Sequence, residues 1–216
     1  MSAAERPVRG LIGTLVLGAV LAAGVARADG VDDFWEWFEY EHEALIAPAT
    51  RVDRHEALVY WLGRIDPALS YELEDGGRRK TLTISADGDV NLFRTVELMI
   101  DRGPKVKGWK LVALRQKQRT LESVTVEPVT LDPATTFFDL YEDSAKIGVV
   151  FYLPVFDADN MAAYRIAAMR LMSQSVGEWE VGLDIGFVDF DNQQVRDMQF
   201  SRPFKDFKTV FAKLRK

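Results

Sequence analysis

Residues 69–100 read LSYELEDGGRRKTLTISADGDVNLFRTVELMI, and this stretch decides the expected fold. Apolar residues alternate with polar ones on both sides of Asp75-Gly76-Gly77. A period of two around a glycine-rich turn predicts a β-hairpin. After Asp87-Gly88-Asp89 the apolar residues recur every three or four positions as far as Ile100. That change of period predicts a helix whose start is capped by aspartate.

Similar patterns extend outward along the chain. A third strand is expected at Trp109 and a short edge strand at Val124. The second half repeats the order of the first. It predicts strands at Phe138–Tyr141 and Ile147–Leu153, a helix after Asp157, strands at Trp179–Ile185 and Val195–Phe200, and a terminal helix from Pro203.

The two halves match when the sequence is shifted by seventy residues without a gap. Asp87 then meets Asp157, and Trp109 meets Trp179. The order of cap, apolar stripe and strand-starting tryptophan favours an internal duplication, although two ordinary strand–helix–strand units would give a similar pattern. The predicted class is α+β, with duplicated β-β-α-β units forming a mixed sheet and helices packed on it. The predicted repeats are 69–117 and 137–190.

Two amphipathic helices are expected before the first hairpin, one starting behind Asp32 and one at Thr50. A third predicted helix ends the chain. The first of them carries an aromatic cluster, which consists of Phe34, Trp35, Trp37, Phe38 and Tyr40. Helical spacing favours a core role for Phe34, Trp37 and Phe38. Trp35 and Tyr40 stay open between core and an exposed platform for a sugar, lipid or peptide.

The chain begins with the three parts of an export signal. Arg6 and Arg9 precede the uncharged apolar run 11–25, and Ala26-Arg27-Ala28 offers small residues to a signal peptidase. We therefore expect residues 1–28 to be a cleavable signal peptide, with cleavage between Ala28 and Asp29. The alternative is an uncleaved membrane anchor. Cleavage leaves one α+β domain, 29–216, that is periplasmic or extracellular, bacterial, and without a membrane span.

Composition restricts the partners. Residues 1–28 contain three arginines and one glutamate, so the rest of the chain carries 24 basic and 32 acidic residues, a formal charge of −8. Nucleic-acid binding depends on neutralising phosphates, so an acidic chain without a basic cluster argues against it. The chain has no cysteine, so packing alone must hold the exported domain together.

Several short segments resemble those of a family of uncharacterised bacterial proteins of unknown function. They are Phe34-Trp35-Glu36-Trp37-Phe38, Ile84-Ser85-Ala86-Asp87-Gly88, and Pro104 followed by Gly108-Trp109. Members of that family share FWxWF, ISAxG and PxxxGW segments. The resemblance covers the first half of the exported chain. It implies a single α+β domain and no catalytic residue.

Three residues of the predicted N-terminal helices are the best candidates for chemistry. Glu39 and His42 are three residues apart, a spacing used by helical metal sites, and His55 lies on the next helix. A second Glu-x-x-His unit is absent, so a solvated acidic face is favoured over a metal site. A metal-dependent or hydrolytic enzyme that uses Glu39, His42 and His55 is the alternative function.

Other candidate motifs have simpler interpretations. The Asp-x-Asp segments at Asp87 and Asp157 resemble parts of calcium loops, which need six to eight oxygen ligands. Helix capping needs only the aspartate itself and is the simpler explanation. Ser85 follows a strand as some nucleophiles do, and its base would have to be His42 or His55. The sequence therefore favours a non-catalytic protein that binds a partner protein or a small ligand in the cell envelope. It assigns no cofactor or metal.

Overall fold

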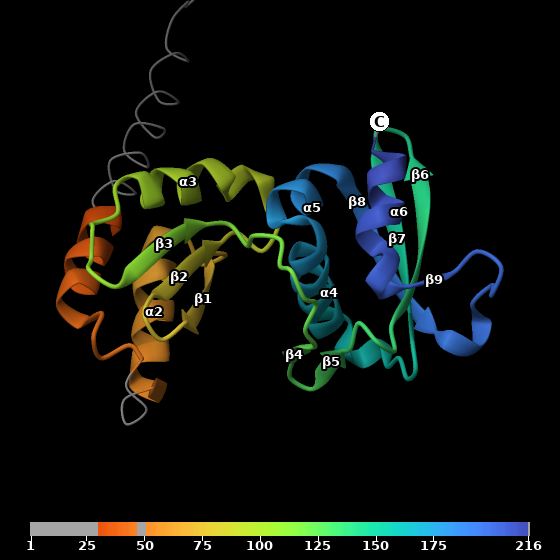
Figure 1. The fold of residues 1–216 in the computed structure, drawn as a ribbon, viewed down its shortest axis with the longest axis horizontal. Coiled ribbons are helices and arrows are strands. Elements are labelled where there is room, and N and C mark those ends of the chain that lie inside the picture. The colour runs from red at the N-terminus through yellow and green to blue at the C-terminus, as the bar shows by residue number, and fades with distance from the viewer. Residues whose placement is uncertain (1–29, 47–50, 216) are drawn as a thin grey trace, which may run out of the picture. The chain divides into compact units, whose positions relative to one another are not determined.

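The computed structural model describes residues 30–46 and 51–215 (Figure 1). They form two compact units, which divide between Ile65 and Asp66. The predicted single domain therefore stays a prediction. No helix of the described part of the chain is long and apolar enough to cross a membrane.

Some sequence predictions fall on residues outside the described part of the chain. These are the signal peptide, its cleavage point at Ala28 and Asp29, and the predicted helix start at Thr50. They stay predictions.

The first unit contains the two predicted helices, and they run antiparallel to each other. Residues 30–41 form the N-terminal helix, and α2 spans Arg51–Ile65. The start of the first helix lies beside the end of the second, because Asp33 pairs with Arg64 at 3.4 Å. At the other end of the pair, Glu41 pairs with Arg54.

The aromatic cluster divides by exposure. Phe34 and Phe38 are fully buried, as predicted, and Trp35 is buried as well. Tyr40 is 87 % exposed. Trp37 is only half-buried, so its prediction as a core residue is wrong in part. Its ring stacks at 6.0 Å on Trp61 of α2, at the surface between the two helices rather than beneath it.

The second unit contains three sheets and the remaining helices. Its elements in chain order are β1 (Ser70–Asp75), β2 (Lys80–Ser85), α3 (Val90–Asp101), β3 (Trp109–Ala113), β4 (Val124–Val126), β5 (Val129–Leu131), β6 (Phe137–Asp143), β7 (Lys146–Leu153), η2 (Ala158–Asn160), α4 (Met161–Val176), α5 (Glu178–Asp184), β8 (Ile185–Asn192), η3 (Gln193–Val195), β9 (Arg202–Pro203), η4 (Phe204–Asp206) and α6 (Phe207–Leu214).

Two parts of this unit share one connectivity. In the order β1-β2-β3 the central strand β2 is antiparallel to β1 and parallel to β3, with α3 between β2 and β3. In the order β8-β7-β6-β9 the central strand β7 is antiparallel to β6 and parallel to β8. The α+β class with helices on mixed sheets is confirmed (Figure 1). The two β-β-α-β parts do not share a sheet, which corrects that expectation. An evolutionary duplication stays a prediction.

The predicted strand from Trp179 to Ile185 is wrong. Residues 178–184 form helix α5, and the strand begins only at Ile185. Trp109 starts β3 whereas Trp179 lies in α5, so the gapless register fails after the helix. A short apolar run with alternating residues fits a strand or a helix. Here the helix is favoured because the carboxylate of its first residue, Glu178, accepts hydrogen bonds from the backbone N–H groups of Ala86 and Gly88.

The predicted strand from Val195 to Phe200 is also wrong. Asp197 turns the chain there, since its carboxylate accepts from the N–H of Gln199 and its carbonyl from that of Ser201. This local side-chain bonding competes with strand formation. Phe200 is consequently 70 % exposed. The chain then rejoins the sheet as the two-residue strand β9 and continues into the predicted terminal helix α6.

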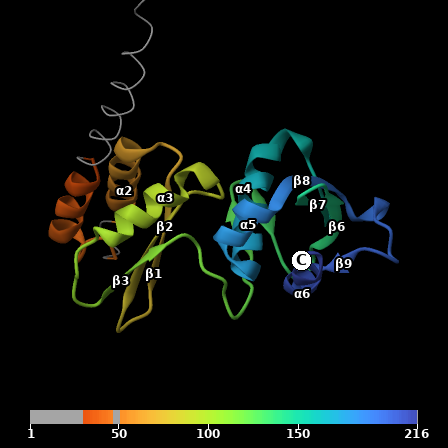
Figure 2. The ribbon, with the colours of Figure 1, turned by 90° about the horizontal axis from the view of Figure 1, so that it is seen from above.

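The largest core lies between the second sheet and its helices. The inward side chains of β6 and β7 include Phe138, Val149 and Phe151, and they pack with residues of α4 and α6. The β4–β5 hairpin, of which only β4 was predicted, contributes to the same core beside α4. Seen from above, α4 and α5 lie next to this sheet (Figure 2). The free edge of β6 is left beside α6.

Candidate functional site

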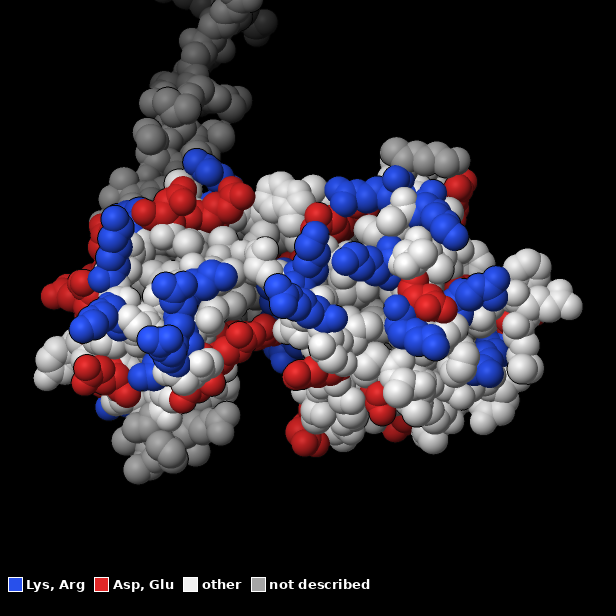
Figure 3. All heavy atoms as spheres, in the orientation of Figure 1, with Lys and Arg blue, Asp and Glu red and all other residues white. Residues whose placement is uncertain are grey.

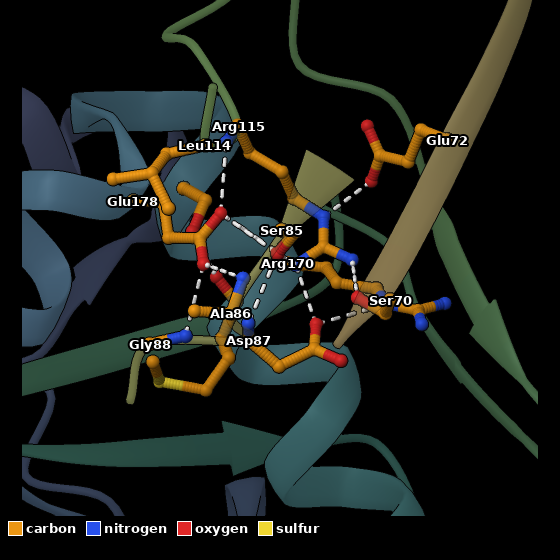
Figure 4. Close-up of polar contacts among 12 residues, drawn as sticks. Ser70, Glu72, Ser85, Ala86, Asp87, Gly88, Leu114, Arg115, Arg170 and Glu178 are labelled. Atoms are coloured by element: carbon orange, nitrogen blue, oxygen red, sulfur yellow. Dashed lines mark hydrogen bonds and ion pairs between the residues drawn. The ribbon is translucent and has the colours of Figure 1, made fainter. Parts of the chain in front are cut away.

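A buried charged network joins the two β-β-α-β parts of the second unit (Figure 4). At its centre are Glu178, the first residue of α5, and Arg115, which follows β3. The Glu178 side chain is fully buried and that of Arg115 is 4 % exposed. Burying two charges is unfavourable unless each is paired and hydrogen-bonded. The arrangement of their partners meets that requirement.

The Glu178 carboxylate accepts four hydrogen bonds. Oε1 accepts from the backbone N–H groups of Ala86 and Gly88 at 2.9 and 3.1 Å. Oε2 accepts from Ser85 Oγ and from the backbone N–H of Arg115, both at 2.8 Å. The loop between β2 and α3 thus forms an anion-binding nest that an acidic side chain of the same polypeptide fills.

The Arg115 guanidinium is equally well satisfied. Nε donates to Glu72 at 2.5 Å, and Nη1 donates to Ser85 Oγ at 2.5 Å and to Asp87. Nη2 donates to Ser70 at 3.1 Å. Burial on its own would lower the pKa of Arg115, but the negative charges of Asp87, Glu72 and Glu178 raise it above its ordinary value. The side chain is therefore permanently charged and fixed.

The network also holds two residues in an unfavourable backbone conformation. Asp87 has φ 47° and Leu114 has φ 57°, in the left-handed region that side chains other than glycine adopt rarely. The N–H of Leu114 donates to Ile84 O at 2.8 Å, and this bond fixes the backbone directly after β3. Such conformations persist only where neighbouring bonds enforce them.

Ser85 lies within this network and is fully buried. Its hydroxyl donates to Glu178 and accepts from Arg115, and neither predicted base, His42 or His55, belongs to these partners. A hydroxyl held in this way cannot reach a substrate. The hypothesis of Ser85 as a nucleophile therefore gains no support from the geometry. The network instead holds the two β-β-α-β parts together.

The metal candidates of the first unit do not come together. Among the described residues, no group of three His, Asp or Glu side chains is close enough to hold a metal ion, so Glu39, His42 and His55 form no such cluster. His42 Nδ1 instead lies 2.8 Å from the carbonyl oxygen of Glu39. His55 is exposed.

The Asp-x-Asp segments have the structural role that capping predicts. Asp89 caps α3 by accepting from the N–H of Asn91 at 2.9 Å. Asp157 caps η2 by accepting from the N–H of Asp159 at 3.1 Å. The capping interpretation is confirmed for both residues, whereas Asp87 serves the charged network.

A different part of the second unit is open to a ligand. A groove of about 620 Å³ runs beside the free edge of β6, and we call it the β6 groove. One side is formed by α6 and the other by the segment that precedes β9. Its lining residues are Phe138, Asp139, Leu140, Tyr141, Tyr152, Val195, Asp197, Phe200, Arg202, Val210, Lys213 and Leu214.

The strand edge in this groove has unpaired backbone groups. β9 pairs with β6 only at Phe137 and Phe138. Thr136 O accepts from Phe204 N, which shows that even-numbered residues turn their backbone groups toward β9. Backbone direction alternates along a strand, so the N–H and C=O groups of Leu140 and Glu142 face the free edge. They face the same side as the β9 pairing but lie beyond its end.

A buried carboxylate lies in the β6 groove. Asp139 is 9 % exposed, and its Oδ2 accepts from Ser201 at 3.2 Å and from Tyr141 at 3.5 Å. Its Oδ1 is buried and has no hydrogen-bond partner in the described part of the chain. Burial raises the pKa of Tyr152, and the neighbouring Tyr141 and Asp139 raise it further. The phenol therefore stays protonated in the usual pH range.

Comparison with known proteins finds no relative: no protein-family model matches the chain, and no curated protein or solved structure matches it significantly. The resemblance to the uncharacterised bacterial family stays a prediction.

Sequence reasoning missed both Asp139 and the Glu178–Arg115 pair. The first had a local signal, because Asp139 lies within the predicted strand Phe138–Tyr141, on the same face as Tyr141. A carboxylate on an apolar face must be paired or hydrogen-bonded, or it must bind a ligand. Glu178 and Arg115 are separated by 63 residues, and nothing in their local patterns connects them.

Proposed function

We propose that the protein is an exported, non-catalytic binding protein of the bacterial cell envelope that binds an extended segment of a partner protein along β6. The observation that carries this proposal is the free edge of β6 within an apolar groove. An extended polypeptide supplies backbone donors and acceptors at the spacing that a strand edge requires. The predicted signal peptide supports the location.

The walls of the β6 groove suit such a segment. Val195 and Phe200 are exposed on one side, and Leu214 of α6 borders the other. A strand added to β6 would direct alternate side chains toward these two walls. Solvent-exposed edges are normally short, charged or covered, so an edge with apolar surroundings marks an interaction site.

Asp139 supplies a polar recognition point. A buried acceptor without a partner costs about 1–3 kcal/mol. A donor brought by the bound segment removes that cost, whether it is a hydroxyl, an amide or a cationic group. The lone Oδ1 of Asp139 therefore supports a groove that is completed by its ligand.

A partner protein fits this edge better than a second copy of the chain. Pairing β6 with β6 of another copy would place two copies of the acidic residues Asp139 and Glu142 in one short strand pair. Like charges opposite one another destabilise a strand pair. The enzymatic alternative has the weaker support, because Glu39, His42 and His55 do not form a metal cluster.

Photo-crosslinking in producing cells tests the proposal. A photoreactive phenylalanine analogue replaces Tyr141 in the groove and, as a control, the exposed Leu98 of α3. We expect a discrete adduct from position 141 in the envelope fraction and none from position 98. Adducts of equal yield from both positions, or none from position 141, would contradict the proposal.

A second pair of variants tests strand addition itself. Glu142→Pro removes an N–H that faces the free edge and leaves the β7 ladder intact, whereas Glu142→Ala removes only the side chain. We expect Glu142→Pro to abolish the adduct at position 141 and Glu142→Ala to retain it. An equal yield from the two variants would argue that the partner binds without adding a strand.

A further inference from the structure

The first unit has a groove of a different chemistry between its two helices. This groove of about 750 Å³, which we call the aromatic groove, is lined by Asp33, Glu36, Trp37, Glu39, Tyr40 and Trp61. Three of these residues are aromatic and three are acidic, and no basic residue lines it. Spacings of three and four residues place Glu36, Glu39 and Tyr40 on one face of the N-terminal helix.

The aromatic faces are available at the surface. Trp37 and Trp61 stack at 6.0 Å with an angle of 27° between their rings. Both are half-buried, and Tyr40 stands out from the helix. Tryptophan and tyrosine faces carry negative electrostatic potential, so they attract cations that have lost part of their hydration.

A cation of the chain itself, the Arg64 guanidinium, already contacts two residues that line this groove. The Arg64 guanidinium lies 5.2 Å from the centre of the Trp61 ring and pairs with Asp33 at 3.4 Å. One cation is thus bound by one aromatic face and one carboxylate. Arg64 thus contacts two of the residues that line the groove, Asp33 and Trp61.

The other two carboxylates that line the groove are those of Glu36 and Glu39. Within the described part of the chain, no basic side chain pairs with Glu36 or Glu39. These two carboxylates line the aromatic groove together with Trp37 and Tyr40. Their charges reinforce the potential of the rings because they surround the same opening.

We propose that the aromatic groove binds an organic cation, an alkylammonium or guanidinium group, over Trp37 and Tyr40 with Glu36 and Glu39 as counter-ions. The proposal is independent of the β6 groove, since it rests on other residues in the other unit. Apolar groups would use the rings but leave the carboxylates without a role, and neutral sugars would leave the carboxylate charges uncompensated. The aromatic groove therefore favours a positively charged ligand.

Titration of the purified protein with matched probes tests the proposal. The probes are choline, its uncharged isostere 3,3-dimethylbutan-1-ol, and N-acetylarginine amide, each followed by the indole N–H resonances of the tryptophans. We expect saturable shifts of Trp37 and Trp61 with choline, with the arginine derivative or with both, and none with the neutral isostere. Binding of choline alone assigns a trimethylammonium ligand, and binding of the arginine derivative alone assigns a polypeptide side chain.

Isosteric variants separate the groove from general surface charge. The double substitution Glu36→Gln and Glu39→Gln preserves shape at exposed positions, and we expect it to weaken binding about tenfold. Glu43→Gln, exposed just beyond the helix, removes a charge outside the groove and should leave the affinity unchanged. Equal shifts with choline and the neutral isostere, no shift with either cation, or an unchanged affinity in the double variant would overturn the proposal.

Discussion

The buried charged network and the β6 groove are both built around a carboxylate, and they differ in how its oxygens are satisfied. Both oxygens of Glu178 accept two hydrogen bonds from groups of the same chain. Asp139 has one satisfied oxygen and one buried oxygen without a partner. A completed set of bonds stabilises the folded chain, whereas an incomplete set leaves a place for a ligand. We therefore assign a structural role to the charged network and a binding role to the β6 groove.

The charged network should give the largest loss of stability. Glu178→Gln replaces one acceptor oxygen by an NH₂ group that faces N–H donors. Disrupting a buried, fully bonded ion pair costs about 3–5 kcal/mol, and we expect a loss of that order in the free energy of unfolding, measured with urea. Glu180→Gln on the same helix is the control. Its side chain is 34 % exposed, and it should change stability by less than about 1 kcal/mol. Similar losses from the two variants would contradict the role of the network.

The next largest effect should come from Arg115→Lys. The lysine keeps the charge, but its compact ammonium cannot span the separate positions of Glu72, Asp87 and Ser70 that the planar guanidinium reaches. We expect a loss of about 2–3 kcal/mol in the free energy of unfolding. The control is Arg94→Lys, whose side chain is 72 % exposed. If Arg115→Lys were as stable as Arg94→Lys, the guanidinium geometry would be irrelevant.

High pH should destabilise the β6 groove region through Tyr152. Its pKa in the folded protein is raised above the ordinary tyrosine value of about 10. A raised pKa contributes stability that is complete below the unfolded value and is lost as the pH rises above it. We expect the unfolding midpoint to fall above about pH 10. Tyr152→Phe should make this fall shallower, and a parallel pH profile for that variant would argue against the assignment.

The smallest effect on stability should come from Asp139→Asn. This is the same chemical change as Glu178→Gln, but it removes the charge from a site where one oxygen is already unpaired. We expect a change of less than about 1 kcal/mol in the free energy of unfolding. The adduct formed through position 141 should nevertheless decrease. A loss of stability as large as that of Glu178→Gln would remove the distinction between the two regions.

Much of the fold follows from local patterns. The β1–β2 hairpin, the Asp89-capped helix α3 and strands β6 and β7 all have periods and end signals that only one element satisfies. Helix α5 could not be predicted in this way, because its helical state depends on donors from the distant β2–α3 loop. The segment from Val195 to Phe200 alternates like a strand, yet Asp197 turns it.

The sites were less accessible to sequence reasoning than the fold. The aromatic cluster was visible at once, but the sequence did not show that Trp61 of the second helix would stack on Trp37. The β6 groove depends on how far β9 extends along β6, which is a property of tertiary pairing. Charges also gave little guidance, since basic and acidic side chains are interspersed on the face drawn in Figure 3.

The most direct measurement is residue-resolved amide hydrogen exchange along β6, in the protein alone and in the adduct captured through position 141. The N–H groups of Leu140 and Glu142 face the free edge, and that of residue 141 faces β7. Strand addition predicts slower exchange in the adduct at Leu140 and Glu142, with no change at residue 141. Unchanged exchange at Leu140 and Glu142 in the adduct would contradict strand addition at this edge.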